Sequence, residues 1–127
     1  MTTEAQPNPW ARIVGPCYTV ASMARTLGWS EADVVEAGKQ LRLLMLCTED
    51  DVRLFPLFQL HNGTVVAGLT EVLRILQIGK GSSWTRAQWL NVELPDSDPP
   101  RNIQRLYEGC IEEVIRDARH VAWAWSS

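Results

Sequence analysis

The chain of 127 residues has no run of apolar residues close to the roughly 20 that a membrane-spanning helix needs. Its opening segment, MTTEAQPNPW, contains neither a basic region nor an apolar one, so it does not resemble a secretion signal. These two absences predict a cytoplasmic protein that has no membrane partner.

Cysteine is scarce as well. Cys17, Cys47 and Cys110 are odd in number, lie far apart and include no CxxC pair. This pattern is not that of a disulfide framework or of a structural zinc site. We therefore expect reduced thiols that pack in the fold, and no bound metal.

Catalytic signatures are also missing. His61 and His120 have no Cys, Asp or Ser nearby at a spacing that indicates a proton relay, and no HExxH or GxSxG motif occurs. Residues 79–83, GKGSS, lack the earlier glycine of a phosphate-binding loop and are typical of a flexible connection. We expect a protein that is not an enzyme and needs no cofactor.

The chain has little excess charge of either sign, because 12 Lys and Arg residues stand against 15 Asp and Glu residues, for a formal net charge of −3. Proteins that mainly grip phosphate backbones usually carry a net positive face, since counterion release drives that binding. The acidic total argues against a nucleic-acid coat protein and a polybasic membrane anchor. Any DNA-binding surface must be local.

The first ordered pattern is a pair of short helices. Apolar residues at positions 20, 23, 24 and 27 form one helical stripe, and Gly28 suits the left-handed turn that ends a helix. Ser30, with Asp33 three residues later, predicts the start of a second helix that runs to about Gln40. The two helices predict a helix-turn-helix. The apolar positions assigned to the second helix are Ala32, Val35 and Leu41.

A β-hairpin is expected next. Residues 43–47 and 52–58 are apolar runs on either side of the polar turn 48–51, and residues 64–66 form a further short strand. Pro56 cannot donate a hydrogen bond to a sheet, so the second run lies at an edge or breaks there. Helix, helix, hairpin is the order of a winged helix-turn-helix.

Helical periodicity returns over residues 68–78, 84–91, 101–107 and 110–125, with the proline-rich loop 92–100 between the second and third of these segments. The predicted fold class is mainly α with a small β-hairpin wing: a winged helix-turn-helix followed by a C-terminal helical bundle. The expected organisation is a flexible leader over residues 1–16, the winged helix-turn-helix-like domain over 17–78 and a helical partner-binding region over 79–127. The alternative is that residues 17–78 and 79–127 pack as one unit.

The candidate DNA contacts are long polar side chains near the second helix and the wing. Acidic residues on that helix, Glu31, Asp33 and Glu36, oppose phosphate binding, so an alternative is a helix-turn-helix used only for folding or protein contact. The candidate double-stranded DNA contacts are Arg25, Lys39, Gln40, Arg42 and Arg53.

The C-terminal half is rich in Trp and Arg, the residue types that anchor protein interfaces. Trp84 and Trp89 lie about 140° apart around a helix, so one packs and the other is partly available. Trp123 lies off the apolar stripe of the last helix and is the best exposed anchor, although tryptophans that simply fill the core are the alternative. The candidate partner contacts are Trp84, Trp89, Arg101, Arg105, Arg116, Arg119 and Trp123.

Three segments carry a family resemblance: LFPLFQLHNGTVVAGLTEVLRIL, WTRAQWLNVELPDSDPP and IQRLYEGCIEEVIRDAR. They resemble the Xre/MbcA/ParS-like antitoxin group over residues 18–119. Positions that match its motifs are Phe55, Pro56, Phe58, Gln59, Gly68, Leu69, Val72, Leu73, Trp89, Leu90, Leu106, Gly109 and Val114.

The resemblance implies an antitoxin that binds and neutralises a RES-type toxin, a protein that degrades NAD. It also implies a helix-turn-helix that acts at the chain's own promoter and a homodimer or hetero-oligomer. The chain departs from the group at Ala67, at Asn102 and in the loop 96–98. The chain resembles small winged-helix DNA-binding transcription regulators, which have no toxin partner, almost as closely. The charge distribution predicts that DNA is not the tightest partner.

Overall fold

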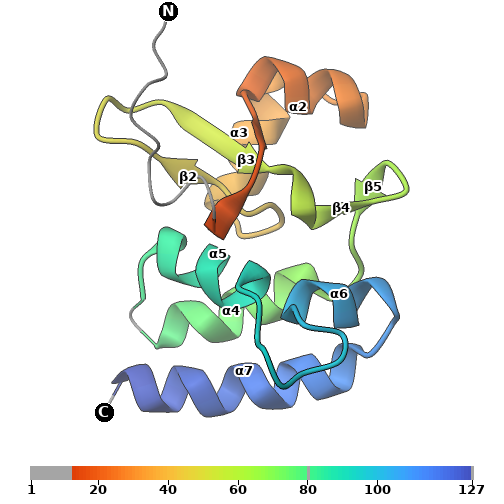
Figure 1. Ribbon diagram of the computed structural model, residues 1–127. Coiled ribbons are helices and arrows are strands. Elements are labelled where there is room, and N and C mark those ends of the chain that lie inside the picture. The colour runs from red at the N-terminus through yellow and green to blue at the C-terminus, as the bar shows by residue number, and fades with distance from the viewer. Residues whose placement is uncertain (1–12, 80, 127) are drawn as a thin grey trace, which may run out of the picture.

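The computed structural model describes residues 13–79 and 81–126, and it shows a mainly helical chain with a small antiparallel sheet. The winged part lies above a layer of C-terminal helices (Figure 1). This confirms the predicted fold class. The elements of the winged part are β1 (Cys17–Tyr18), α2 (Val20–Leu27), α3 (Glu31–Lys39), β2 (Leu46–Cys47), β3 (Arg53–Pro56), the 3-10 turn η1 (Leu57–Gln59), β4 (Leu60–His61) and β5 (Thr64–Val65).

The sheet has the strand order β1-β3-β2, with all pairs antiparallel. The helices α2 and α3 fall between β1 and β2 in the chain, and the β2–β3 hairpin forms the wing. The strand β3 lies at the centre of the sheet and not at an edge. It ends at Pro56, so the missing N–H of this proline does not interrupt the hydrogen bonds within the strand. The expected strand at residues 64–66 pairs with β4 in a separate hairpin and does not extend the wing.

Side-chain caps fix both helices of the helix-turn-helix. The Thr19 hydroxyl accepts a hydrogen bond from the Ser22 backbone N–H, and the Ser30 hydroxyl accepts one from the Asp33 N–H at 3.0 Å. Gly28 ends α2 with a φ of +73°, a left-handed conformation that glycine adopts without strain. The predicted Ser30 cap and Gly28 turn are therefore confirmed.

The buried face of α3 differs from the expected one. Its buried residues are Val34, Ala37 and Gly38, whereas Ala32 is exposed and Val35 is only half-buried. The positions 34, 37 and 38 also have helical spacing, and they include a glycine that was not counted as a core residue. Val34 and Ala37 share a hydrophobic cluster with Met23 of α2, and Gly38 leaves room for the side chain of Met45, which follows α3.

The helices of the lower layer are α4 (Leu69–Ile78), α5 (Ser83–Asn91), α6 (Asn102–Tyr107) and α7 (Ile111–Ser126). The predicted stripe of α4 is confirmed, because Leu69, Val72, Leu73 and Leu76 are all buried. The helices α4 and α7 run in the same direction, since Gly68 lies against Ile111 at one end and Gly79 against Ala122 at the other. They form the main contact of this layer.

Two hydrophobic clusters hold the chain together. Met23, Val34, Leu43 and Phe55 form the smaller one inside the winged part. The larger cluster joins buried residues of the sheet region, such as Leu46, to those of α4, α5, α6 and α7. One core therefore spans the expected boundary at residue 79, and the two regions pack together.

The expected flexible leader lies mostly outside the described residues, because the structure describes it only from residue 13 onward. Val14 is buried in the larger cluster with 2% of its surface exposed. The Ile13 carbonyl accepts a hydrogen bond from the Asn91 side chain at 2.8 Å. Residues 13–16 are thus part of the folded chain.

The segment around residue 80 has a packing role that its glycine-rich composition did not predict. A Cβ atom on Gly79 would lie 2.9 Å from the Ala122 Cα and carbonyl oxygen, and one on Gly81 would lie 3.1 Å from the Trp125 ring. These glycines let the end of α7 approach the chain closely. The composition of a flexible linker here reflects close packing.

The side-chain amide of Gln59 is fully buried and hydrogen-bonds the backbone as a neighbouring strand would. Its Oε1 accepts from the Leu44 N–H at 2.8 Å, and its Nε2 donates to the carbonyls of Leu44 and Pro56, each at 3.0 Å. Buried backbone groups must find partners, and here one side chain satisfies both groups of Leu44. The glutamine of the family-like motif thus has a structural role.

Candidate functional site

The predicted DNA contacts are all exposed on the helix-turn-helix, the segment that follows it and the wing. Lys39 and Gln40 lie at the C-terminal end of α3, and Arg42 follows them, with all three side chains exposed. Arg53 is exposed on β3, and Arg25 is exposed in the last turn of α2. The fold therefore leaves all five side chains accessible on the winged part.

A hydrogen-bonded chain orders part of this surface. The Glu36 carboxylate accepts from Gln40 Nε2 at 2.9 Å, and Gln40 Oε1 accepts from Arg42 Nε at 3.0 Å. Gln40 therefore holds the Nε of the Arg42 guanidinium, and the Arg42 side chain stays exposed. The arrangement presents one cation at the end of α3.

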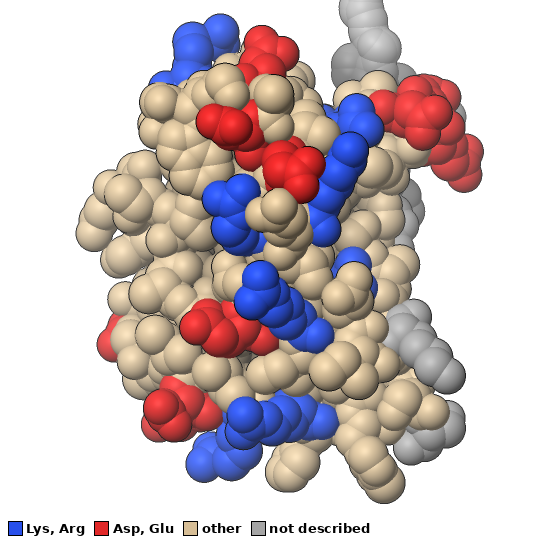
Figure 2. All heavy atoms as spheres, turned by 180° about the vertical axis from the view of Figure 1, so that it is seen from behind, with Lys and Arg blue, Asp and Glu red and all other residues tan. Residues whose placement is uncertain are grey.

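Acidic side chains share the same surface. Glu31, Asp33 and Glu36 are all exposed on α3, as the sequence predicted. Figure 2 shows Asp and Glu side chains beside Lys and Arg side chains over the upper part of the molecule, where α2 and α3 lie. The surface is therefore mixed in charge, not a uniform basic face.

The predicted partner residues fall into two groups. Those nearer the start of the helical layer turn inward. Trp84 is half-buried, and its Nε1 donates to the Cys47 carbonyl at 3.2 Å, which ties α5 to the wing. Arg101 Nε donates to the Asn91 carbonyl at 3.0 Å, and its Nη2 lies 3.3 Å from Glu93 Oε2.

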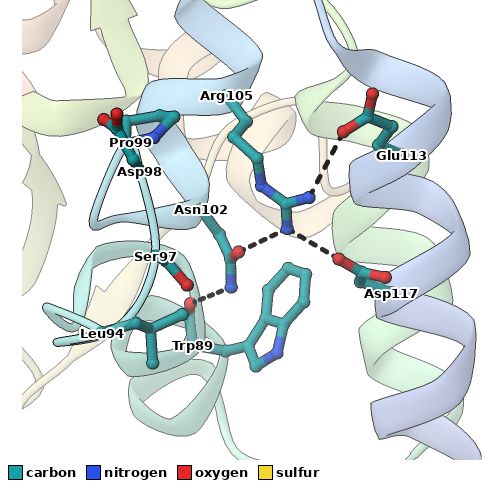
Figure 3. Close-up of a pocket in the computed structure, with 9 residues that line it drawn as sticks. All are labelled: Trp89, Leu94, Ser97, Asp98, Pro99, Asn102, Arg105, Glu113 and Asp117. Atoms are coloured by element: carbon teal, nitrogen blue, oxygen red, sulfur yellow. Dashed lines mark hydrogen bonds and ion pairs between the residues drawn. The ribbon is translucent and has the colours of Figure 1, made fainter.

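Arg105 is the most enclosed of the predicted partner arginines. Its Nη2 donates to Asn102 Oδ1 at 2.6 Å and to Asp117 Oδ2 at 2.8 Å, and its Nη1 lies 3.8 Å from Glu113 Oε1 (Figure 3). Asn102 is itself buried, and its Nδ2 donates to the Trp89 carbonyl at 2.9 Å. These contacts join α5, α6 and α7, so Arg105 has a structural role that sequence reasoning did not identify.

A pocket of about 390 Å³ opens beside this network, between the loop after α5 and the helix α7. Figure 3 shows the Trp89 side chain pointing into the space between α5 and α7, next to the Arg105 guanidinium. The Arg105 guanidinium forms ion pairs with two of the three carboxylates that line the pocket, those of Asp117 and Glu113, whereas Asp98 lies across the pocket from it (Figure 3). The residues that line the pocket are Trp89, Leu94, Ser97, Asp98, Pro99, Asn102, Arg105, Glu113 and Asp117.

The second group of predicted partner residues lies on the outer face of α7. Arg116, Arg119 and Trp123 are exposed, and Trp123 keeps 75% of its surface accessible, as expected for an exposed anchor. Beside them is a shallow, mainly apolar groove of about 280 Å³ between α4 and α7. Ile78 at the end of α4 is 73% exposed and also lines this groove.

Two further polar groups escaped the sequence analysis. The Tyr107 hydroxyl donates to the Phe58 carbonyl, and the Tyr107 ring stacks on His61 with centroids 4.7 Å apart. Burial raises the pKa of Tyr107, and the Arg101 charge opposes that rise to a smaller extent. These contacts fasten the β4–β5 hairpin to α6, and no local sequence signal pairs residues so far apart.

Arg86 on α5 is a half-buried cation. Its Nη1 donates to the Gly81 carbonyl at 2.6 Å, and its Nε is buried without a hydrogen-bond partner among the described residues. Burial lowers the pKa of its guanidinium. Arg86 therefore helps to hold the turn between α4 and α5.

Within residues 13–79 and 81–126, no cluster of three or more His, Cys, Asp or Glu side chains has the arrangement of a metal site. In the same part of the chain, no helix is both long enough and apolar enough to cross a membrane.

The chain matches no protein-family model, and no curated protein matches it in sequence. Among solved structures, it is similar to the NMR structure of Rv2175c, with a TM-score of 0.70 and 21% sequence identity. The match covers 95% of this chain and 86% of that chain. At this level of identity, the similarity establishes a shared fold and nothing more.

Proposed function

We propose that this chain is a DNA-binding protein that uses its winged helix-turn-helix and performs no catalysis. The observation that carries the proposal is the arrangement of the winged part. In the chain, α2 and α3 come between β1 and β2 of the β1-β3-β2 sheet, and the outer face of α3 and the β2–β3 hairpin are both exposed. In a helix-turn-helix, the second helix enters the major groove while neighbouring elements contact the backbone.

The charges of α3 favour one mode of binding. Lys39 and Arg42 lie at its C-terminal end and Arg53 lies on the wing, so phosphate contacts would come from that end. Asp33 and Glu36 would be repelled by phosphates, but carboxylates accept hydrogen bonds from the cytosine amino group in the major groove. This separation of cations from carboxylates predicts weak binding to DNA of any sequence and a larger gain in affinity at a specific site.

The test is a titration of the full chain against a fluorescein-labelled duplex from the region upstream of its own gene, at two salt concentrations. A scrambled duplex of the same composition is the comparison. Each phosphate contact contributes about 0.9 to the slope of log K against log salt, so four cations give a slope of about −3 to −4. Equal affinity for both duplexes, or binding that ignores salt, would contradict the proposal.

A matched pair of variants locates the surface. The double variant Arg42→Gln with Arg53→Gln should weaken duplex binding by at least tenfold and reduce the salt slope by about 2, because two phosphate contacts are lost. Arg119→Gln removes an equally exposed arginine from α7 and should leave duplex binding unchanged.

A second candidate function is the neutralisation of a RES-type toxin by the C-terminal helices. The exposed Arg116, Arg119 and Trp123 on α7 favour it, since Arg and Trp anchor protein interfaces. If a RES-type toxin is encoded beside this chain, co-expression should restore growth, and charge reversal of Arg116 and Arg119 should abolish that rescue. A failure of the wild-type chain to restore growth would contradict this function.

A further inference from the structure

We infer that the groove between α4 and α7 binds an acidic, amphipathic segment of a protein partner. The inference depends neither on DNA binding nor on a toxin. It rests on how the fold arranges apolar and basic side chains along two helices that run in the same direction.

The apolar part of the groove lies at the C-terminal ends of the two helices. Ile78 on α4 and Trp123 on α7 keep 73% and 75% of their surfaces exposed, and Ile75 and Ala122 line the groove with them. Apolar residues of this size are costly to leave in water, and adjacent exposed ones mark interaction sites. An apolar anchor of a partner therefore fits here.

The basic part of the groove follows from the parallel register of the helices. Gly68 packs on Ile111 and Gly79 packs on Ala122, so positions on α7 lie level with positions on α4 that are 43 residues earlier. Arg74 on α4 precedes Ile78 by one turn, and Arg119 precedes Trp123 by one turn, so both arginines lie just beyond the apolar end. Arg119 lines the groove itself.

These arginines differ from those elsewhere in the helical layer. Arg74 and Arg119 are exposed and form no ion pair within the described part of the chain, whereas Arg101 and Arg105 are bonded to carboxylates. Arg116, exposed one turn before Arg119, forms a single long ion pair among the described residues, with its neighbour Asp117 at 3.9 Å. Figure 2 shows Lys and Arg side chains over the lower part of the molecule, beside uncharged surface and some Asp and Glu side chains.

The order of these groups specifies the chemistry of the partner. The groove presents an apolar end and then Arg119; Arg74 and Arg116 lie outside it, each one turn before a residue that lines it, and the acidic Glu71 lies one turn before Arg74 on α4. A segment with an aromatic or aliphatic anchor, followed about one helical turn later by Asp or Glu, matches that order. Helices that bind in grooves commonly use such anchors at spacings of three and four residues.

The experiment selects peptides from a random phage-displayed library on the immobilised full chain. The sequences enriched are then synthesised with a fluorescent label and titrated in solution. Enriched peptides should combine an aromatic or aliphatic residue with Asp or Glu about one turn away, and the synthetic peptide should bind saturably. Enrichment of basic or uncharged peptides, or no saturable binding, would overturn the inference.

Variants place the peptide on the groove. Trp123→Ala should weaken peptide binding by at least tenfold, and Arg119→Gln by about fivefold or more, while the urea midpoint of each stays that of the wild type. Arg25→Gln, an exposed arginine on α2, is the matched control and should have no effect on the peptide. Equal affinities for Arg119→Gln and Arg25→Gln would overturn the inference.

A second copy of the chain is the competing occupant. The wing turn carries Glu49, Asp50 and Asp51 next to Val52, which is 46% exposed, so a second copy also offers acidic and apolar groups. Sedimentation of the chain alone should give a monomer that the peptide leaves monomeric. A dimer or longer assembly that Trp123→Ala dissociates would overturn the inference in favour of self-association.

Discussion

The exposed arginines of the winged part and the two arginines of α6 and its N-cap in the helical layer are used in opposite ways. In the winged part, Arg42 and Arg53 are exposed, and the ordered contact of Arg42 is with an uncharged amide. In the helical layer, Arg101 and Arg105 lie between helices, where carboxylates and carbonyls accept their hydrogen bonds. An arginine in the sequence thus indicates a cation, but packing decides whether it faces a partner or a neighbouring helix.

Close packing, by comparison, is similar in the two parts. A Cβ on Gly38 in the winged part would lie 2.6 Å from the Met45 sulfur and 2.8 Å from the Met45 Cβ, and one on Gly79 in the helical layer would lie 2.9 Å from backbone atoms of Ala122. Rotation of the Met45 side chain moves its sulfur but not its Cβ, so both positions require the backbone to shift. Both parts should therefore tolerate an added side chain poorly at these glycines.

The largest effect is expected at Gln59, which lies between the two parts. Gln59→Ala leaves the buried N–H and carbonyl of Leu44 without their partner and should lower the free energy of unfolding by about 2–5 kcal/mol. Urea denaturation followed by circular dichroism measures the loss. Gln77→Ala, an exposed glutamine on α4, is the control and should change stability by less than about 0.5 kcal/mol. Equal midpoints for the two variants would show that the Gln59 contacts do not matter.

The next effect compares two glycines. Gly79→Ala places a Cβ 2.9 Å from Ala122 backbone atoms and should cost about 1–3 kcal/mol, because α7 must move. Gly38→Ala places a Cβ 2.8 Å from the Met45 Cβ and should also be destabilising, although a gain of up to about 1 kcal/mol in helix propensity reduces its cost. Thermal unfolding of both variants measures the two costs. If either variant is as stable as the wild type, the close packing assigned to that glycine is wrong.

A smaller effect separates the arginines. Arg105→Met removes bonds to Asn102 and Asp117 and should cost about 1–2 kcal/mol after allowance for partial exposure, while Arg42→Met should change stability by less than about 0.5 kcal/mol. Chemical denaturation at neutral pH measures both values. For duplex binding we expect the reverse, with a loss for Arg42→Met only. A duplex-binding loss for Arg105→Met without loss of stability would contradict this assignment.

The smallest effect concerns cysteine reactivity. Burial raises the pKa of the Cys17 thiol, so its reactive thiolate is rarer near pH 8, and Cys17 should react with iodoacetamide severalfold more slowly than the exposed Cys47. Peptide mass spectrometry after timed labelling measures each rate. In urea the two rates should become similar. Equal rates in the folded chain would contradict the burial of Cys17.

Much of the fold was accessible from local patterns. The caps at Gly28 and Ser30 and the stripe of α4 depend on residues within a few positions of one another, and each was predicted correctly. The buried face of α3 was misassigned because Gly38 is not recognised as a core residue from its type alone. The separate β4–β5 hairpin was missed because strand pairing depends on partners that are distant in the chain.

The candidate sites were predicted less completely than the fold. The exposure of Trp123, Lys39 and Arg42 followed from helical periodicity and chain position. The inward roles of Arg101 and Arg105 could not be predicted in this way. Arg101 reaches Glu93, and Arg105 reaches Asp117, only because α6 packs on its neighbours. Likewise, the groove between α4 and α7 exists because two helices far apart in sequence lie side by side.

The sequence by itself determined approximately where the helices begin and end, where the wing hairpin lies and how the charges balance, because these depend on local spacing and composition. Only the tertiary structure decided which cations are available to a partner. The backbone can approach closely at Gly79, and this seats α7 beside α4. That packing encloses Arg105 and leaves Arg119 beside an exposed tryptophan. Burial and pairing are properties of the folded surface, so no count of residues along the chain contains them.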